Sequence, residues 1–406
     1  MKLCLVVGNF PELSESFIIR LIEGLIAKGI SISLHVTGSY REDKLHEHSS
    51  LSEAMIAGRL KIISSDSNLL AYAISLAFGL KYLPIAVKSG VRIKTILKSL
   101  RFIMELRGHG ERYDVIHAQF LNLALPLAFA REVRALPNST ALLSTIRGFD
   151  ITNKAAVCDK EVKLIQKNID LLLPVSNSLA QSATARGLNK KKIHVVYSGL
   201  DVQKVQYRNP SELSDRSVSF IQVGRLVGKK GVDMSVRLIA TLKKKGIKCH
   251  LKIIGYGPDE ENLRTMVKDL NVEDSIMFVG PLPNKAVLEH ISASDFLLAP
   301  SRTAKNGDKE GIPNVVKEAM AIGCIVIASD HSGVPELILD GETGYLFREN
   351  SPEEYTEAAM RALNNSNEII AINARARVLK YFDTAVVVGT LVDIYRALPV
   401  IISKGV

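Results

Sequence analysis

The sequence predicts an α/β protein of two domains, each built on a doubly wound parallel sheet. Three observations lead to this prediction. The chain has 406 residues, more than one hydrophobic core usually organises. Short apolar blocks, typical of strands that helices cover on both faces, alternate with amphipathic stretches along the chain. A polar segment at 201–217 has no long apolar run and divides these blocks into two series.

The domain boundaries follow from the same pattern. The first series opens with an apolar block at 2–8, an amphipathic run closed by Gly29 and a second apolar block, which is how a parallel sheet begins. The last segment contains a helix-length apolar stretch, and we expect it to pack back toward the first domain. We therefore predict a first domain at 1–200, a linker at 201–217, a second domain at 218–382 and a C-terminal helix at 383–406.

Composition excludes several classes of protein. Hydrophobic residues make up 47% and charged residues 23% of the chain, which excludes a disordered protein. No apolar run approaches the roughly 20 residues that span a bilayer, and the N-terminus lacks the layout of a signal peptide. The four cysteines form no CxxC pair, so neither a zinc site nor a disulfide framework is indicated. These features favour a cytoplasmic protein.

The positive charge is unevenly placed, because the whole excess of +10 lies in residues 1–200. Part of it lies at 69–107, where apolar residues recur at helical spacing among lysines and arginines and Glu105 is the one acid. We expect Pro84 to divide this stretch into two helices. Such a segment can lie on an anionic membrane surface, or it can be an ordinary packed helix pair. Nucleic acid is a weaker candidate partner, since the chain has no Trp and few other aromatics for stacking.

The strongest functional motif runs from Glu310 to Glu318. Pro313 is placed to open a helix, Gly323 can end it, and Gly311 lets the backbone approach a ligand closely. A helix N-terminus at the carboxyl edge of a parallel sheet binds anions, and carboxylates accept hydrogen bonds from sugar hydroxyls. A nucleotide sugar carries both kinds of group, whereas the alternative is a capped helix with incidental acids.

A second motif at 224–231 follows an apolar block directly and precedes a helical stretch. It places Arg225, Lys229 and Lys230 among three glycines, and such a strand-to-helix turn suits a diphosphate. Arginine offers phosphate oxygens a planar fork and lysine a point charge. Alone this motif could be a solvated turn. Together with the first motif in the same predicted domain it indicates a nucleotide-sugar site.

With these motifs the chain resembles the retaining glycosyltransferases of the GT-B fold, the large family-four group. Glu310 and Glu318 match the E-x7-E motif of that group, and Arg225, Lys230 and Gly231 match its G-R-…-K-G turn. The resemblance covers most of the chain and implies two Rossmann-like domains that face each other across a cleft. Further matching segments are 255–258, 278–280, 299–301, 333–336 and 340–344 in the second half and 175–178 and 198–201 near the end of the first.

The resemblance also implies roles for individual residues. Arg225 and Lys230 would hold the donor diphosphate and Glu310 would bond the transferred sugar, so these three are the candidate catalytic residues. Glu318 would bond the nucleotide ribose. The co-substrate would be a sugar of the UDP or GDP type, with no other cofactor and no metal, since the chain contains no Asp-x-Asp. The remaining candidate donor-binding residues are Gly224, Gly255, Gly257, Gly280, Leu282, Gly311, Ile312, Pro313 and Asn314.

The opening of the chain, residues 10–18, is similar to that of glycosyltransferases that build exopolysaccharides of the colanic-acid type on lipid-linked acceptors. That likeness implies a glycan or polyprenyl-linked acceptor and work at the inner face of the cell membrane. Arg147 departs from the family, which has a histidine before Gly-Phe-Asp; because a guanidinium cannot act as a base, it could bind a phosphate or carboxylate instead. The candidate acceptor-side residues are Ser14, Glu15, Ser16, Arg147 and Asp150.

The sequence therefore predicts a hexosyltransferase that uses a nucleotide-diphosphate sugar and retains the anomeric configuration. A sugar-nucleotide epimerase and a glycan phosphorylase on a similar fold are alternatives, as is a non-catalytic nucleotide-sugar-binding protein. Product analysis separates the enzymes, because an epimerase needs no acceptor and a phosphorylase needs inorganic phosphate.

Overall fold

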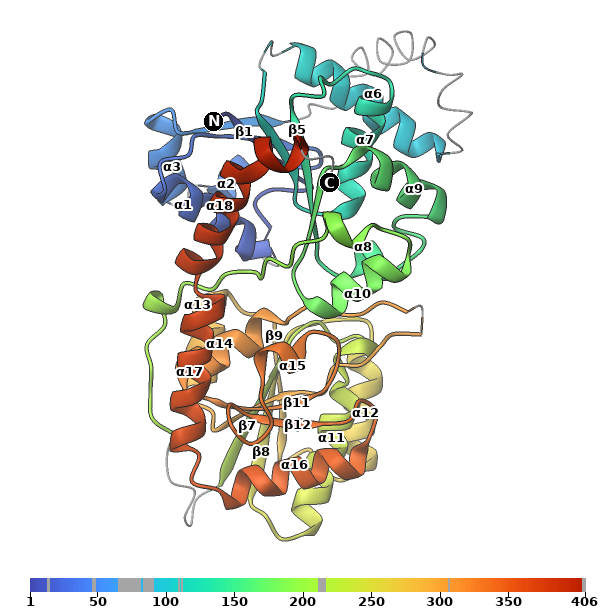
Figure 1. Ribbon diagram of the computed structural model, residues 1–406. Helices are drawn as coiled ribbons and strands as arrows, with labels where there is room; N and C mark the ends of the chain where they lie inside the picture. The colour runs from blue at the N-terminus through green and yellow to red at the C-terminus, as the bar shows by residue number, and fades with distance from the viewer. Residues whose placement is uncertain are drawn as a thin grey trace. The chain divides into compact units, whose positions relative to one another are not determined.

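The structure is a computed structural model that describes residues 1–12, 15–45, 49–64, 82, 91–108, 110, 112–210, 217–305 and 307–403. The chain forms two compact units, one of Met1–Gly199 with Val387–Val406 and one of Leu200–Val386 (Figure 1). Each unit contains one six-stranded sheet in which all neighbouring strands are parallel. The predicted α/β class with two doubly wound domains is therefore confirmed.

The sheet of the first unit has the strand order β3-β2-β1-β4-β5-β6. Every residue of β1 (Leu3–Val7) and β5 (Ala141–Ile146) is buried, as expected for strands with helices on both faces. The other strands are β2 (Ile32–Val36), β3 (Leu60–Ser64), β4 (Val115–Ala118) and β6 (Leu171–Pro174). The helices are α1 (Ser16–Ala27), α2 (Glu42–Leu45), α3 (Ser49–Ile56), α6 (Ile93–Gly108), η3 (Leu121–Leu123), α7 (Ala124–Glu132), α8 (Phe149–Thr152), α9 (Asp159–Asn168), α10 (Asn177–Ala185) and η4 (Lys190–Lys192).

Two hydrophobic clusters fill the first unit. One joins the sheet to α6, α7 and α9, and the other joins it to α1, α3 and the C-terminal helix α18 (Thr384–Ser403). In α18, Val388, Leu391 and Tyr395 are buried in the second cluster. Figure 1 shows this helix in red, ending beside the strands of the first unit. The last segment of the chain is thus part of the core of the first unit.

A buried histidine fixes α18 to the sheet. His117 in β4 lies with Nδ1 2.7 Å from the Tyr395 hydroxyl and Nε2 2.9 Å from Thr145 Oγ1. Burial lowers the pKa of His117 to about 3, and the charge of Arg147 acts in the same direction. His117 is therefore a neutral, doubly hydrogen-bonded core residue.

Of the basic segment at 69–107, the structure describes Tyr82 and the residues from 91 on. The expected division at Pro84 lies outside the described residues. Helix α6 turns Leu100, Phe102 and Ile103 into the core, while Lys94 and Lys98 are exposed. The apolar face of this part of the segment therefore packs in the protein. Among the described residues, no helix is both long and apolar enough to cross a bilayer.

The sheet of the second unit has the order β12-β11-β10-β7-β8-β9. Counted from its own first strand, this is the same winding as in the first unit. The strands are β7 (Val218–Val223), β8 (Cys249–Ile254), β9 (Ile276–Gly280), β10 (Phe296–Ala299), β11 (Ile325–Ser329) and β12 (Tyr345–Phe347). The helices are η5 (Val202–Lys204), η6 (Gly228–Lys230), α11 (Val232–Lys244), α12 (Glu260–Asp269), α13 (Asn284–Ser292), α14 (Asn314–Ile322), α15 (Val334–Leu337), α16 (Pro352–Asn364) and α17 (Glu368–Phe382).

The winding reverses between β7 and β10, which are neighbours in this sheet although two strands separate them in the sequence. In doubly wound sheets ligands bind outside the carboxyl ends of the strands at such a switch point. The turn after β7 is 224–231, and the loop after β10 runs from Pro300 to Pro313. The two predicted donor motifs therefore meet at the one edge where the fold favours a binding site.

Candidate active site

Close backbone contacts shape the turn after β7. The peptide N–H of Gly224 donates to Ile254, and that of Leu226 donates to Tyr256. A Cβ atom on Gly255 would lie 1.9 Å from the carbonyl oxygen of Gly224, and one on Gly257 would lie 2.3 Å from that of Leu226. Both distances are far below van der Waals contact, so only glycine fits at Gly255 and Gly257. The structure thus gives these two predicted donor-binding glycines a packing role in the turn.

Four charged side chains join the turn to the loop after β10. Lys230 Nζ lies 2.7 Å from Glu310 Oε1 and donates a hydrogen bond to Glu310 Oε2 at 2.8 Å. Lys229 Nζ lies 2.8 Å from Asp308 and 4.0 Å from Glu310. Each of the four is less than a fifth exposed. Lys230 and Glu310, both predicted for the donor site, therefore lie together within a cluster of two cations and two anions.

The charge state of Glu310 follows from this cluster. Burial raises the pKa of its carboxyl, but the charge and hydrogen bond of Lys230, together with the charge of Lys229, hold the pKa below its usual value. Glu310 is therefore an ionised acceptor near neutral pH. Arg225 differs from the lysines, because its side chain is exposed and has no ion pair with another described residue. Arg225 can therefore bind an anion without first breaking an ion pair.

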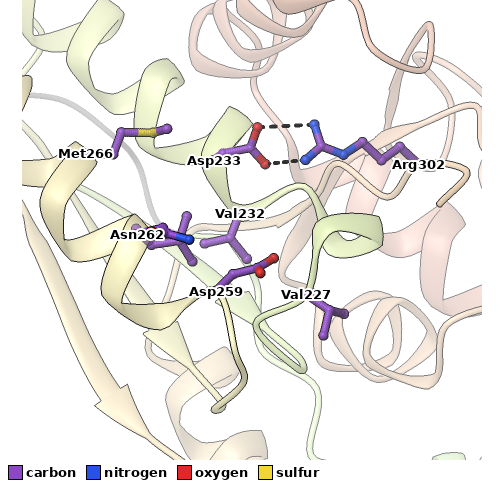
Figure 2. A pocket seen from close by; sticks show the side chains of 8 residues that line it. Val227, Val232, Asp233, Asp259, Asn262, Met266 and Arg302 are labelled. Carbon is purple, nitrogen blue, oxygen red and sulfur yellow. Dashed lines mark hydrogen bonds and ion pairs between the residues drawn. The ribbon is translucent and has the colours of Figure 1, made fainter. Parts of the chain in front are cut away.

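The near end of the loop is tied to α11. Arg302 forms a two-pronged ion pair with Asp233, with contacts of 2.8 and 3.1 Å, and its Nε donates to the carbonyl of Gly228 at 2.7 Å. Figure 2 shows this ion pair at the wall of a cavity of about 130 Å³ between α11 and α12. The peptide N–H of Arg302 also donates to the Lys229 carbonyl. Arg302 therefore fixes the loop and the turn to each other.

Behind the loop lies His331, a side chain with no solvent exposure. Its Nε2 lies 3.3 Å from the peptide nitrogen of Glu310, and its Nδ1 lies 2.9 Å from Glu349 Oε2. Glu349 Oε1 in turn accepts the peptide N–H of Thr303 at 2.6 Å. His331 and Glu349 thus contact both ends of the segment from Thr303 to Glu310.

Helix α14 follows the loop and is almost entirely buried, with every residue from Val316 to Ile322 in the interior. It begins at Asn314 with Pro313 just before it, one position later than predicted, and Gly323 ends it in a left-handed conformation. Gly311 and Ile312 lie in the segment that leads into it. Glu318 is 4% exposed and accepts a hydrogen bond from Asn284 at 3.3 Å. Gly280 ends β9 and Leu282 follows it, just before α13.

The predicted acceptor-side residues of the first unit form a different kind of site. Arg147 donates to the carbonyl and side-chain oxygens of Gln119 and to Ser198, and it stacks 3.8 Å above the ring of Phe17. Burial lowers the pKa of Arg147 to about 10, although Asp150 and Glu15 oppose this. The guanidinium is therefore still a cation at neutral pH, and it is already engaged by protein groups.

The carboxylate of Asp150 is buried and accepts the peptide N–H groups of Leu121, Arg147 and Gly148. In the structure it holds two loops at the carboxyl edge of the sheet. Glu15 precedes the first helical residue, Ser16. Burial raises the pKa of Glu15 while Arg147 lowers it, and among the described residues its Oε2 atom has no hydrogen-bond partner. Ser14 lies outside the described residues.

Comparisons with known proteins agree with this geometry. Residues 203–378 match the family described as glycosyl transferases group 1. The chain is 27% identical to the amylovoran biosynthesis glycosyltransferase AmsK of Erwinia amylovora, over 98% of this chain and all of AmsK. It is 27% identical to the putative colanic acid biosynthesis glycosyltransferase WcaL of Escherichia coli, over 93% of this chain and 94% of WcaL. Residues 203–378 are therefore a group 1 glycosyltransferase domain.

Comparison with solved structures identifies the fold. Anabaena HepE, crystallised with UDP and glucose, superposes with a TM-score of 0.71 at 15% identity over 98% of this chain and all of HepE. The lipopolysaccharide outer core galactosyltransferase WaaB superposes with a TM-score of 0.68 at 20% identity over the full length of both chains. The predicted GT-B fold and the likeness to exopolysaccharide enzymes are confirmed.

Sequence reasoning missed several residues of the glycosyltransferase site. Asp308 and Asp233 lie far in sequence from the cations they bind, Lys229 and Arg302. His331 lies two residues before the matched segment 333–336, but no spacing rule connects it to Glu310. Within the described residues there is no group of three or more potential metal ligands.

The glycine packing yields a stability prediction. Gly257→Ala should destabilise the glycosyltransferase by about 1–3 kcal/mol, the usual cost of overpacking, because the new Cβ overlaps the Leu226 carbonyl. Gly228→Ala is the matched control in the same region, since a Cβ there meets nothing within 4 Å. Urea unfolding of both variants measures the difference, and equal midpoints would contradict the packing role.

Proposed function

We propose that this glycosyltransferase transfers a hexose from a nucleotide-diphosphate sugar to a glycan or polyprenyl-linked acceptor, with retention of configuration, in the synthesis of a bacterial surface polysaccharide. The observation that carries the proposal is the meeting of Lys230 and Glu310 at the switch point of the second sheet. The names of AmsK and WcaL support the polysaccharide, and the UDP and glucose bound by HepE support the donor class.

The donor diphosphate would bind the turn at 224–231. Arg225 offers a planar fork that no described acid occupies. Lys230 carries three donors, so it can keep Glu310 with one of them while it binds a phosphate oxygen with another. These cations would stabilise the charge that develops on the departing diphosphate. The dipole at the start of α14 would add to that stabilisation.

The ionised carboxylate of Glu310 would accept hydrogen bonds from hydroxyls of the transferred sugar. The backbone at Gly311 and Ile312 lies next to it in the chain. Glu318 would bond the ribose, and Gly280 and Leu282 would border the base, which we infer to be uracil or guanine. Front-face attack assisted by the leaving phosphate oxygen would give retention, because the acceptor enters on the face from which the diphosphate leaves. This route needs no covalent nucleophile from the protein.

Removing either member of the central pair should abolish transfer. We expect Glu310→Gln and Lys230→Ala each to lose at least about 2–3 kcal/mol of transition-state stabilisation, since each deletes one charge-stabilising group. Lys243→Ala is the matched control, because Lys243 pairs with Asp274 at the exposed surface of the same unit. Transfer rates and product configuration are measured with thermal unfolding as the folding check. Unchanged turnover in both folded variants would remove the site assignment.

We further propose that no metal takes part in the reaction. The two lysines and Arg225 supply the positive charge that a divalent cation would otherwise bring to the diphosphate. Transfer should then continue in excess EDTA at nearly the original rate. A rate that falls in EDTA and returns with magnesium or manganese would contradict this proposal.

For the acceptor, we propose that the first unit binds an anionic membrane surface at the inner face of the cell membrane. Lys94 and Lys98 are exposed on the first turns of α6 and line a shallow hollow of about 190 Å³. Arg92 lines the same hollow, but it binds the buried Glu161 and two backbone carbonyls. The free cationic surface therefore belongs to the two lysines, and α6 would touch lipid with its charge rather than its apolar face.

Vesicles of phosphatidylglycerol should bind the glycosyltransferase at low salt. Binding should weaken as salt rises, because the attraction decays over about 8 Å at physiological ionic strength. Lys94→Gln with Lys98→Gln should lower the affinity by about 1 kcal/mol per lysine. Lys160→Gln with Lys163→Gln removes the same charge from the exposed face of α9 and is the control. Co-sedimentation measures binding, and wild-type protein that ignores these vesicles would exclude this surface.

A further inference from the structure

The hydrogen-bonded pair of His331 and Glu349 has no part in the donor contacts proposed above. His331 lies between β11 and α15, and its side chain has no solvent exposure. Glu349 follows β12 and is a quarter exposed. The two residues therefore follow β11 and β12, which lie on the opposite side of β10 from β7 and its turn at 224–231.

The polarity of the hydrogen bonds fixes the state of the imidazole. A peptide N–H can only donate, so Nε2 of His331 must accept from Glu310, 3.3 Å away. The remaining proton is then on Nδ1, which donates to Glu349 Oε2 at 2.9 Å. His331 is thus a neutral imidazole. Its bond to the Glu349 carboxylate fixes the orientation of the ring, and the ring in turn orients the peptide group of Glu310.

Glu349 is itself held in place. Its Oε1 accepts the peptide N–H of Thr303, and its own peptide N–H donates to Asp330 at 2.8 Å. Burial raises the pKa of Glu349, but the hydrogen bonds from His331 and Thr303 hold it below its usual value. The carboxylate therefore stays ionised as an acceptor for the peptide N–H of Thr303 and for His331, which in turn contacts Glu310.

A third contact comes from the same segment as His331. The peptide N–H of Gly333 donates to the carbonyl of Gly311 at 3.3 Å. The peptide groups of Glu310 and Gly311 are thus both bonded from behind, while Lys230 binds the Glu310 carboxylate from the turn. Lys230 and Lys229 attract the carboxylate of Glu310. Without the bond to His331, this attraction would act on a residue whose own peptide N–H had lost that hydrogen bond.

We infer that His331 and Glu349 are positioning residues that hold the backbone of Glu310 in the orientation required for its carboxylate to meet the donor sugar. This rests on the proposed function of Glu310. Catalytic groups work within narrow limits of position, and their supporting hydrogen bonds set those limits. The donor-side carboxylate of this glycosyltransferase therefore depends on a histidine that does not touch the donor.

Two isosteric variants separate the two ring nitrogens. In His331→Gln the amide oxygen can take the place of Nε2 and accept the Glu310 N–H, while the bond to Glu349 is lost. In His331→Asn the amide nitrogen can take the place of Nδ1 and donate to Glu349, while the Glu310 N–H loses its acceptor. Both variants remove one bond of the buried imidazole, so a merely structural role predicts similar effects of the two.

The first measurement is hydrogen exchange by mass spectrometry on the peptide that covers Thr303 to Pro313 in the full chain. His331→Asn should speed exchange of the Glu310 amide in this peptide at least about tenfold, because that amide loses the one acceptor that it has among the described residues. His331→Gln should stay within about threefold of wild type. His290→Asn, on α13, is the control and should change nothing. Equal exchange in the Asn and Gln variants, or exchange that follows only their thermal stability, would overturn the inference.

The second measurement is transfer with UDP-glucose, UDP-galactose or GDP-mannose, whichever the wild-type enzyme uses. His331→Asn should lower kcat about 10-fold to 100-fold, as for a displacement of about 1 Å, with the affinity for UDP or GDP alone unchanged. His331→Gln should retain most of the rate. If the exchange results hold but Glu310→Gln leaves turnover unchanged, the proposed function fails while the positioning contact stands. If His331→Asn keeps wild-type kcat while Glu310→Gln loses it, the inference fails alone.

Discussion

The second unit depends on one cluster of opposed charges in a mostly buried place. Lys229 and Lys230 come from the turn after β7, and Asp308 and Glu310 come from the loop after β10. A buried ion loses its hydration, and removing one partner leaves an uncompensated charge. The turn and the loop are therefore stable only together. The ion pair of Arg302 with Asp233 brings the two segments close enough for this compensation.

The same cluster explains how the site can bind an anionic donor although each of its two lysines is already paired with an acid. The acids keep the lysines at fixed positions, so they need not be ordered when the donor arrives. Preorganised charges of this kind are effective because little reorganisation is left for the reaction itself. Arg225 is the exception, since it is exposed and has no acid beside it among the described residues.

Much of the fold followed from the sequence because strand burial and helix periodicity are local properties. Apolar blocks such as Leu3–Val7 mark buried strands directly, and the order of blocks gave the doubly wound class and the motif positions. The family resemblance placed Lys230 and Glu310 in one donor site, but the ion pair between them was not predicted. The bonds of Arg147 to Gln119 and Ser198 were not predictable, because they join loops from different strands. His331 was missed for the same reason, and the roles of Glu318, Gly280 and Leu282 stay predictions.

The C-terminal helix has a consequence for how the protein is made. Val388, Leu391 and Tyr395 complete the core of the first unit, yet they are translated after the whole second unit. During synthesis the apolar face that α18 covers therefore stays exposed on the first unit, while the second unit can already fold. Domains normally fold in order from the N-terminus as the ribosome delivers them. Here the order is reversed for the last step, and the apolar face of the first unit stays uncovered until α18 docks.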